Sequence, residues 1–198
     1  MPLTNMNNLT VLGDDIYVYK NFLSKEECDY IYGLLESSEK ESWGKMWGDV
    51  DESISPKISP EMIVSELIIS RLSDLSNKYE VKQNRLFTKM VKGNSWGEHS
   101  DNAMYQEIRK KSNLLKDGDD FKIIHNTAYG VVVYINDNYK GGEIFYSKQN
   151  IVYKPKAGDL VIHSSEEKCE HGVKVMIEGS RYAWSSNLGN SIRIPVEK

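Results

Sequence analysis

The chain has 198 residues, a net charge of −4 and a hydrophobic fraction of 39%. These values fit one globular domain over residues 1–198 with a sizeable core, and they exclude a disordered chain. The slight net negative charge disfavours a nucleic-acid partner. The compact basic cluster, Arg109-Lys110-Lys111, does not change this expectation, because we interpret it as a solvated helix face.

The N-terminal segment Met1–Thr10 is polar and lacks the basic and apolar regions of a signal peptide. No apolar run reaches the length of a membrane span. The two cysteines, Cys28 and Cys169, are too few for a disulfide framework. We therefore expect a protein of the reducing cytoplasm that does not contact a membrane.

Two helices are predicted in the first part of the chain, after a strand at 15–19. The first begins at Ser24, with Glu27 completing a capping box, and runs to about Ser37. A polar segment at 42–57 follows and contains Trp43 and Trp47. The second helix begins at Ser59-Pro60. The positions expected to face the core are Ile31, Leu34 and Leu35 in the first helix and Ile63, Leu67, Leu72 and Leu75 in the second.

From about residue 81 the pattern changes to short strands separated by turns. Short strands after two helices predict an α+β protein, mainly β, with a double-stranded β-helix (jelly-roll) core. We place the helical support at about 15–80 and the core at about 81–190. The expected strands are 85–92, 124–136, 143–146, 151–153, 159–163, 172–177 and 182–188.

His99-Ser100-Asp101 lies among these strands and is followed much later by His171 and Arg181. Residues i and i+2 of a strand share a face, so His99 and Asp101 can reach one ion. Two imidazoles and one carboxylate form the facial triad that holds Fe(II) with open positions.

The third ligand has three candidates among the four histidines of the chain: His125, His163 and His171. For His125 and His163 we prefer packing or surface hydrogen bonding. His171 has the better context, because the segment Gly172–Gly179 leads directly to Arg181. A fixed guanidinium there could bind a dicarboxylate such as 2-oxoglutarate in a bidentate manner.

Five segments, taken in order, resemble the 2-oxoglutarate/Fe(II)-dependent dioxygenase superfamily, in its prolyl 4-hydroxylase-like branch. They are Asn21–Cys28 (NFLSKEEC), Phe87–Asp101, Tyr134-Ile135-Asn136 with Gly141-Gly142-Glu143, Lys154–Ile162 (KPKAGDLVI) and Gly179–Ala183 (GSRYA).

The resemblance implies an enzyme that hydroxylates an unactivated C–H bond and releases succinate and CO₂. Its cofactors would be Fe(II), held by His99, Asp101 and His171, with 2-oxoglutarate and O₂ as cosubstrates and ascorbate as an allowed reductant. Arg181 would pair with the distal carboxylate of 2-oxoglutarate, and Tyr134 would add a hydroxyl donor. Related halogenases carry a small residue in place of the carboxylate, so Asp101 favours hydroxylation.

The chain departs from that pattern at two positions where the family often has tyrosine, Met90 and Trp96. Met90 cannot donate a hydrogen bond, which gives Tyr134 a larger expected role. A prolyl or other side chain of a peptide or protein is the preferred substrate, and a small molecule stays open. The segments 42–57 and 102–122 are expected to flank the mouth of the site. The alternative function is a non-catalytic jelly-roll module that senses a metal or metabolite.

Overall fold

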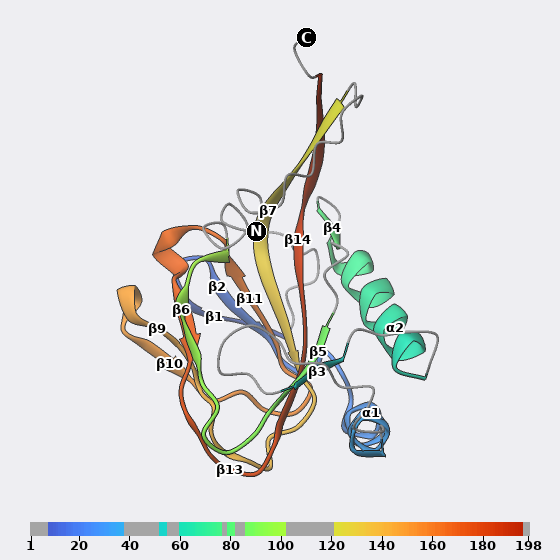
Figure 1. Ribbon diagram of the computed structural model, residues 1–198, viewed down its shortest axis with the longest axis vertical. Helices are drawn as coiled ribbons and strands as arrows, with labels where there is room; N and C mark the ends of the chain where they lie inside the picture. Colours follow the sequence, from blue (N-terminus) through green and yellow to red (C-terminus); the bar gives the residue numbers. More distant parts are fainter. Residues whose placement is uncertain are drawn as a thin grey trace.

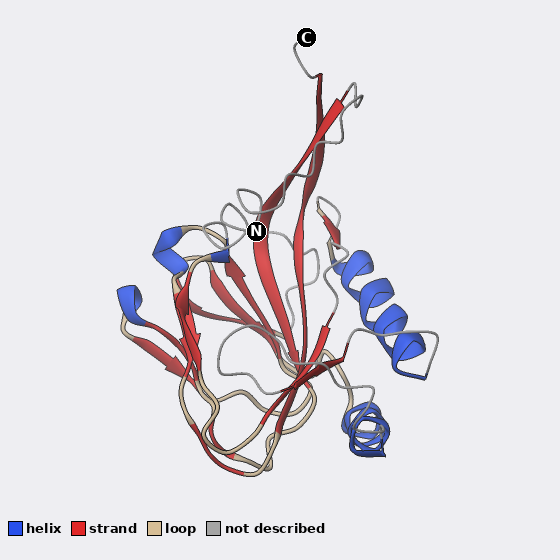
Figure 2. Ribbon diagram, viewed as in Figure 1, coloured by secondary structure: helices blue, strands red, loops and turns tan. Residues whose placement is uncertain are grey.

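Two β-sheets face each other, and two helices cover the outer side of the larger sheet (Figures 1 and 2). The computed structural model describes residues 8–37, 52–54, 60–76, 79–81, 86–101 and 121–195, with the backbone alone at 52–54, 60–63, 86, 121–126 and 191–195. The predicted jelly-roll core supported by N-terminal helices is confirmed.

The larger, or major, sheet has eight strands in the order β1-β2-β11-β7-β14-β5-β3, with β4 paired to β14. Strands β7 and β14 are the longest, and they continue beyond the rest of the sheet as a two-stranded ribbon (Figure 1). The strand bounds are β1 Leu9–Gly13, β2 Ile16–Tyr19, β3 Glu52–Ile54, β4 Glu80–Val81, β5 Leu86–Met90, β7 Phe121–Tyr134, β11 Leu160–Ser164 and β14 Arg181–Pro195.

The minor sheet has the strand order β10-β9-β12-β6, and β13 pairs with β8 alone. All of these pairings are antiparallel. Two short 3-10 helices, η2 Ser147–Gln149 and η3 Glu167–Cys169, follow β9 and β11. The strand bounds are β6 Trp96–His99, β8 Lys140–Gly141, β9 Ile144–Tyr146, β10 Ile151–Tyr153, β12 His171–Val173 and β13 Met176–Glu178.

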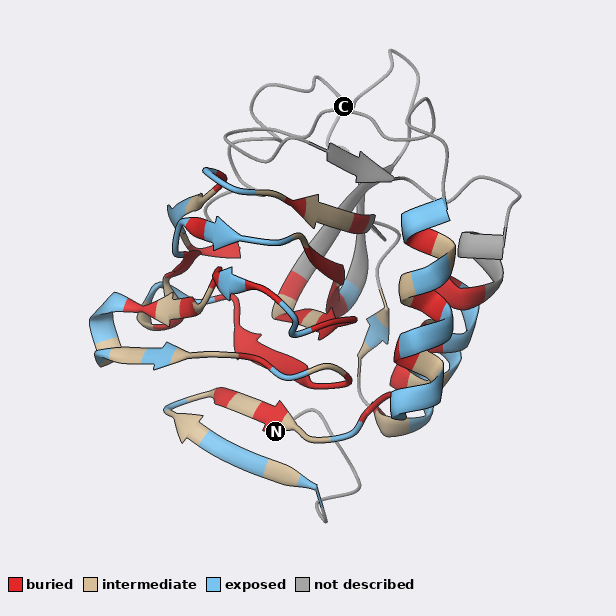
Figure 3. Ribbon diagram, turned by 90° about the horizontal axis from the view of Figure 1, so that it is seen from below, coloured by how far each residue is buried: buried red, intermediate tan, exposed pale blue. Residues whose placement is uncertain are grey.

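Strand β11 shows how the alternation of side chains divides the core. Leu160 and Ile162 pack in the cluster shared with the helices, whereas Val161 between them belongs to the cluster between the sheets. All three side chains are fully buried, because both faces of this strand are covered. Figure 3 shows the resulting concentration of buried residues on the central strands and along the helices.

Helix α1 (Lys25–Ser37) begins with the predicted capping box. The Ser24 amide donates to Glu27 Oε2 at 2.8 Å, and the Glu27 amide donates to Ser24 Oγ at 3.2 Å. Arg71 of helix α2 (Pro60–Leu75) holds both oxygens of Glu27, at 2.7 and 2.9 Å, which joins the two helices. Trp184 Nε1 donates to Ser65 Oγ at 2.9 Å and links α2 to β14.

Three predicted features differ in the structure. Leu67 is 42% exposed, because α2 turns Val64, Ile68 and Leu72 toward the sheet instead. The single strand expected at 172–177 is divided into β12 and β13, because the chain leaves β9 after Val173 and pairs with β8 from Met176. Part of the polar segment 42–57 forms β3, whose backbone pairs with β5.

Other predictions fall outside the described residues: Trp43 and Trp47, the cluster Arg109-Lys110-Lys111, and the segment 102–120. Among the helices that the structure describes, none combines the length and apolarity needed to cross a bilayer.

Candidate metal and cosubstrate site

The candidate metal ligands meet where β6 and β12 of the minor sheet pair. His171 lies directly opposite His99 in the antiparallel register, and Asp101 follows β6 by two residues. One donor atom from each of His99, Asp101 and His171 lies within 4.8 Å of the others. The His99 Nε2 and Asp101 Oδ1 atoms are 3.6 Å apart. The structure therefore brings together the three residues predicted from the sequence as candidate ligands of one ion.

Both imidazoles are oriented through the nitrogen that faces away from the site. His99 Nδ1 lies 2.9 Å from the carbonyl oxygen of Gly97, and His171 Nδ1 lies 3.1 Å from that of Cys169. A carbonyl oxygen can only accept, so each Nδ1 carries the hydrogen. In the neutral ring the lone pair is then on Nε2, as a metal ligand requires.

The charge states of His171 and Asp101 also suit a divalent cation. Burial lowers the pKa of His171 to about 3, which keeps this imidazole neutral at physiological pH. Burial would raise the pKa of Asp101, but its contacts with His163 and His99 outweigh burial and hold the pKa well below its usual range. Asp101 is thus an anion buried among imidazoles, a donor set that fits Fe(II).

Arg181 is a buried cation at the first position of β14. It is 4% exposed, and among the described residues no carboxylate forms an ion pair with it. Its Nη1 approaches the sulfur of Met90 at 3.0 Å, and its Nε has no hydrogen-bond partner. A buried charge without an anionic partner is costly, so the arrangement favours a bound anion.

Two tyrosine hydroxyls beside Arg181 are also buried without partners. The guanidinium carbon lies 4.8 Å from the ring centroid of Tyr134, the last residue of β7. The hydroxyls of Tyr134 and Tyr139 both lie next to the Arg181 guanidinium and have no other hydrogen-bond partner within the described part of the chain. Hydroxyl donors next to a guanidinium can together satisfy a carboxylate group. These unused donors are the observation that fits the distal end of 2-oxoglutarate.

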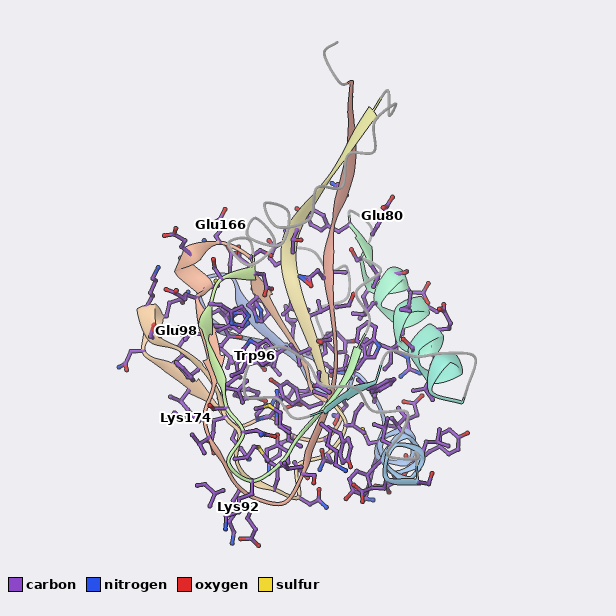
Figure 4. All side chains as sticks on the ribbon, in the orientation of Figure 1. Glu80, Lys92, Trp96, Glu98, Glu166 and Lys174 are labelled. Carbon is purple, nitrogen blue, oxygen red and sulfur yellow. The ribbon has the colours of Figure 1, made fainter. Side chains whose placement is uncertain are left out.

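A single cavity of about 160 Å³ contains both sets of residues. It lies between the sheets and is lined by the three candidate ligands, by Arg181 and Tyr134, and by the apolar side chains of Val132, Ile144 and Ala183. Trp96 also lines it, and its ring centroid is 6.0 Å from that of His99. Figure 4 shows Trp96 and Glu98 on β6, with side chains filling the space between the sheets.

The other two histidines have different positions. His125 lies in β7, and only its backbone is described. His163 was interpreted as a packing or surface residue; it is 1% exposed, so the surface alternative is wrong. His163 Nε2 lies 3.5 Å from Asp101 Oδ2, although His163 is not one of the residues whose donor atoms cluster within 4.8 Å.

Sequence reasoning missed His163 and Tyr139 as neighbours of the site. Strict alternation along the predicted strand 159–163 would have placed His163 on the same face as Val161, toward the cavity. Tyr139 lies in the turn between the predicted strands, where no periodicity indicates the direction of a side chain.

Comparison with known proteins supports the fold. No family model matches the chain. A viral collagen prolyl hydroxylase from Paramecium Bursaria Chlorella virus-1 superposes with a TM-score of 0.58 at 14% identity, covering 91% of this chain and 98% of that one. A prolyl-4-hydroxylase from Pseudomonas putida gives 0.58 at 14% identity, covering 89% and 92%.

A prolyl hydroxylase from Trichoplax adhaerens, solved with a peptide fragment of hypoxia inducible factor, gives a TM-score of 0.53 at 16% identity, with 88% of this chain and 83% of that one covered. In sequence, 60 residues are 35% identical to the mouse protein Prolyl 3-hydroxylase 3. This match covers 28% of the chain but only 8% of the mouse protein. The chain therefore has the fold of the prolyl hydroxylases.

Proposed function

We propose that the chain is an Fe(II)- and 2-oxoglutarate-dependent dioxygenase that hydroxylates an unactivated C–H bond. The observation that carries this proposal is the pairing, in one cavity, of a His-Asp-His group with a buried guanidinium that has no anionic partner among the described residues. A simple metal-binding protein would need the first feature but not the second.

In this proposal each residue has a defined role. His99 and His171 bind iron through Nε2, and Asp101 contributes a negative charge that offsets part of the charge of the ion. Bound iron, with 2-oxoglutarate and O₂, supplies the oxidising chemistry, and succinate and CO₂ are released. Arg181 and Tyr134 hold the distal carboxylate of the cosubstrate, and Tyr139 extends this set of donors. Val132, Ile144 and Ala183 give the cavity an apolar wall, which limits water in the site.

A prolyl or other side chain of a peptide or protein is the proposed substrate. The support is the fold shared with proteins named for prolyl hydroxylation, one of which was solved with a peptide. A cytoplasmic location belongs to the same proposal, because a reducing compartment keeps iron ferrous and suits the two free cysteines, Cys28 and Cys169.

The test is an anaerobic titration of the purified protein with Fe(II) and then with 2-oxoglutarate. We expect the visible charge-transfer absorption of a ferrous 2-oxoglutarate chelate, and its loss in the His171→Ala variant. Admission of O₂ should then convert 2-oxoglutarate to succinate slowly without substrate. Absorption without any succinate would favour the sensor alternative, and a folded protein that binds neither component would refute the dioxygenase assignment.

A further inference from the structure

The two oxygens of the Asp101 carboxylate have different neighbours. Oδ1 lies 3.6 Å from Nε2 of His99, one of the three candidate ligands. Oδ2 lies 3.5 Å from Nε2 of His163, on β11 of the major sheet. His163 is not part of the clustered donor set, and it faces the carboxylate oxygen that does not contact His99. The proposed function gives no role to this contact.

His163 is held from its other side by Tyr146. The Tyr146 hydroxyl lies 2.9 Å from His163 Nδ1, and both side chains are at most 1% exposed. The ring of His163 also packs against the ring of His171, with centroids 3.9 Å apart. The imidazole is therefore fixed by a hydrogen bond at one edge and by packing on one face.

This arrangement selects one tautomer of the neutral ring. A phenol is protonated at neutral pH and can donate to Nδ1, which leaves the ring hydrogen on Nε2, directed at Asp101. The opposite tautomer would point a lone pair of Nε2 at Oδ2, placing two acceptors against each other. At His99, where the lone pair of Nε2 also lies near Asp101, a bound cation would satisfy both acceptors. For the neutral ring, the chain Tyr146–His163–Asp101 is consistent when each member donates to the next.

Gly130 leaves the room that this contact needs. It lies opposite His163 in the pairing of β11 with β7. A Cβ atom at Gly130 would lie 2.2 Å from Asp101 Oδ2 and 2.5 Å from His163 Nε2, closer than atoms can approach. Asp101 and His163 thus pack directly against the backbone of β7 at Gly130, so their contact requires that this position has no side chain.

We propose that His163, backed by Tyr146, is a positioning residue that donates from Nε2 to Asp101 Oδ2 and directs Oδ1 toward the metal. The inference rests on the proposed function, because it requires Asp101 to be a ligand. Hydrogen bonds to ligating carboxylates fix ligand orientation, and loss of such a partner typically weakens metal binding about 10–100-fold.

The test is a Co(II) titration of the purified full chain, which reports affinity and coordination geometry through visible absorption without any turnover. His163→Phe keeps a buried ring but removes the donor, and we expect Co(II) to bind about 10–100-fold more weakly and to be released faster to a chelator. His163→Gln carries an amide nitrogen near the place of Nε2 and should recover most of the affinity. Tyr146→Phe should have an intermediate effect.

Ile162→Val is the matched control, since Ile162 is buried on the opposite face of the same strand. It should alter stability slightly and leave the Co(II) affinity and spectrum unchanged. Unchanged affinity and release rate in His163→Phe would overturn the proposal, and so would the same result in Tyr146→Phe should the first variant fail to fold. If His163→Gln loses Co(II) as completely as His171→Ala, His163 is itself a ligand and the positioning role is wrong.

Failure of the proposed function would look different. The wild-type chain would then bind neither Co(II) nor Fe(II), which is seen before any variant is made, and the inference would fall with it. Binding in the wild type with no dependence on His163 would refute the inference alone.

Discussion

Gly130 offers the sharpest test of the site at the scale of single residues. We expect Gly130→Ala to weaken Co(II) or Fe(II) binding at least about tenfold, because the new methyl group must displace Asp101, His163 or both. Gly97→Ala is the matched control. Gly97 lies on β6 beside His99, its Cβ would meet no atom within 4 Å, and its carbonyl remains able to accept from His99. Equal metal affinities in the two variants, measured by titration, would contradict the packing described here.

Arg181 carries a second prediction at this scale. Arg181→Met keeps most of the side-chain length but removes the charge, so the 2-oxoglutarate dissociation constant should rise at least about tenfold while metal affinity changes little. The 2-oxoglutarate dissociation constant of Arg181→Lys should lie between those of the wild type and Arg181→Met, since an ammonium group keeps the charge but not the two parallel N–H donors of a guanidinium. Anaerobic titrations of metal and cosubstrate, done separately, measure the two constants. Similar losses of metal affinity and 2-oxoglutarate affinity would mean that Arg181 maintains the structure of the whole site and does not act on the cosubstrate specifically.

The sequence predicted residues of the site only where spacing constrains geometry. His99 and Asp101 are two apart on an extended segment, which places them on one side whatever the rest of the fold. The contact between His163 and Asp101 depends instead on how β11 of the major sheet faces the end of β6 in the minor sheet. Tyr139 reaches Arg181 from a turn. Such contacts across sheets follow from tertiary packing, and no local pattern encodes them.

At the scale of elements, the ion pair between Glu27 and Arg71 joins α1 to α2. Glu27→Gln should lower the free energy of unfolding by about 1 kcal/mol at pH 7, because the pair and the capping box both lose a charge-assisted bond. The hydrogen bond from Arg71 holds the pKa of Glu27 below its usual value of 4.5. Its stabilisation is therefore complete above pH 4.5 and is lost as the pH falls through the lower pKa of the folded state.

Urea unfolding of the metal-free protein from pH 7 to pH 3.5 measures this effect. The difference in free energy of unfolding between the wild type and Glu27→Gln should become smaller below pH 4.5. Glu26→Gln is the control for the Arg71 contact, since Glu26 lies in the same helical turn and bonds to Ser24 but not to Arg71. A backbone hydrogen bond also lowers the pKa of Glu26, so a smaller pH-dependent difference is expected there. A difference that stays constant with pH would show that the Glu27 carboxylate is not the source of the stabilisation.

Elements were predicted best where the chain itself determines them. The start of α1 follows from Ser24 and Glu27, whose reciprocal hydrogen bonds are local. The face of α2 was misjudged at Leu67, because this helix is apolar on more than one side and the sheet selects Val64 and Ile68. Strand β3 was missed because its partner, β5, supplies the pairing. A short polar segment carries no periodic signal for an edge strand.

At the scale of the whole molecule, the two halves of the site belong to different sheets. The candidate metal ligands lie on or directly after strands of the minor sheet, β6 and β12. Arg181 and Tyr134 lie at the ends of β14 and β7 in the major sheet. A cosubstrate bound to both the metal and Arg181 would therefore bridge the sheets, whereas the metal alone would hold mainly the minor sheet.

This division predicts a stepwise effect of ligands on thermal unfolding. Co(II) at about 100 times its dissociation constant should stabilise the fold by about 2.7 kcal/mol, a shift in Tm of about 5–10 °C for a chain of this size. Anaerobic addition of 2-oxoglutarate should raise Tm again. His171→Ala should lose both increments, because the cosubstrate would bind through the metal, and Arg181→Met should lose most of the second increment alone. Scanning calorimetry measures both steps, and a second increment that survives in Arg181→Met would place the cosubstrate away from β14.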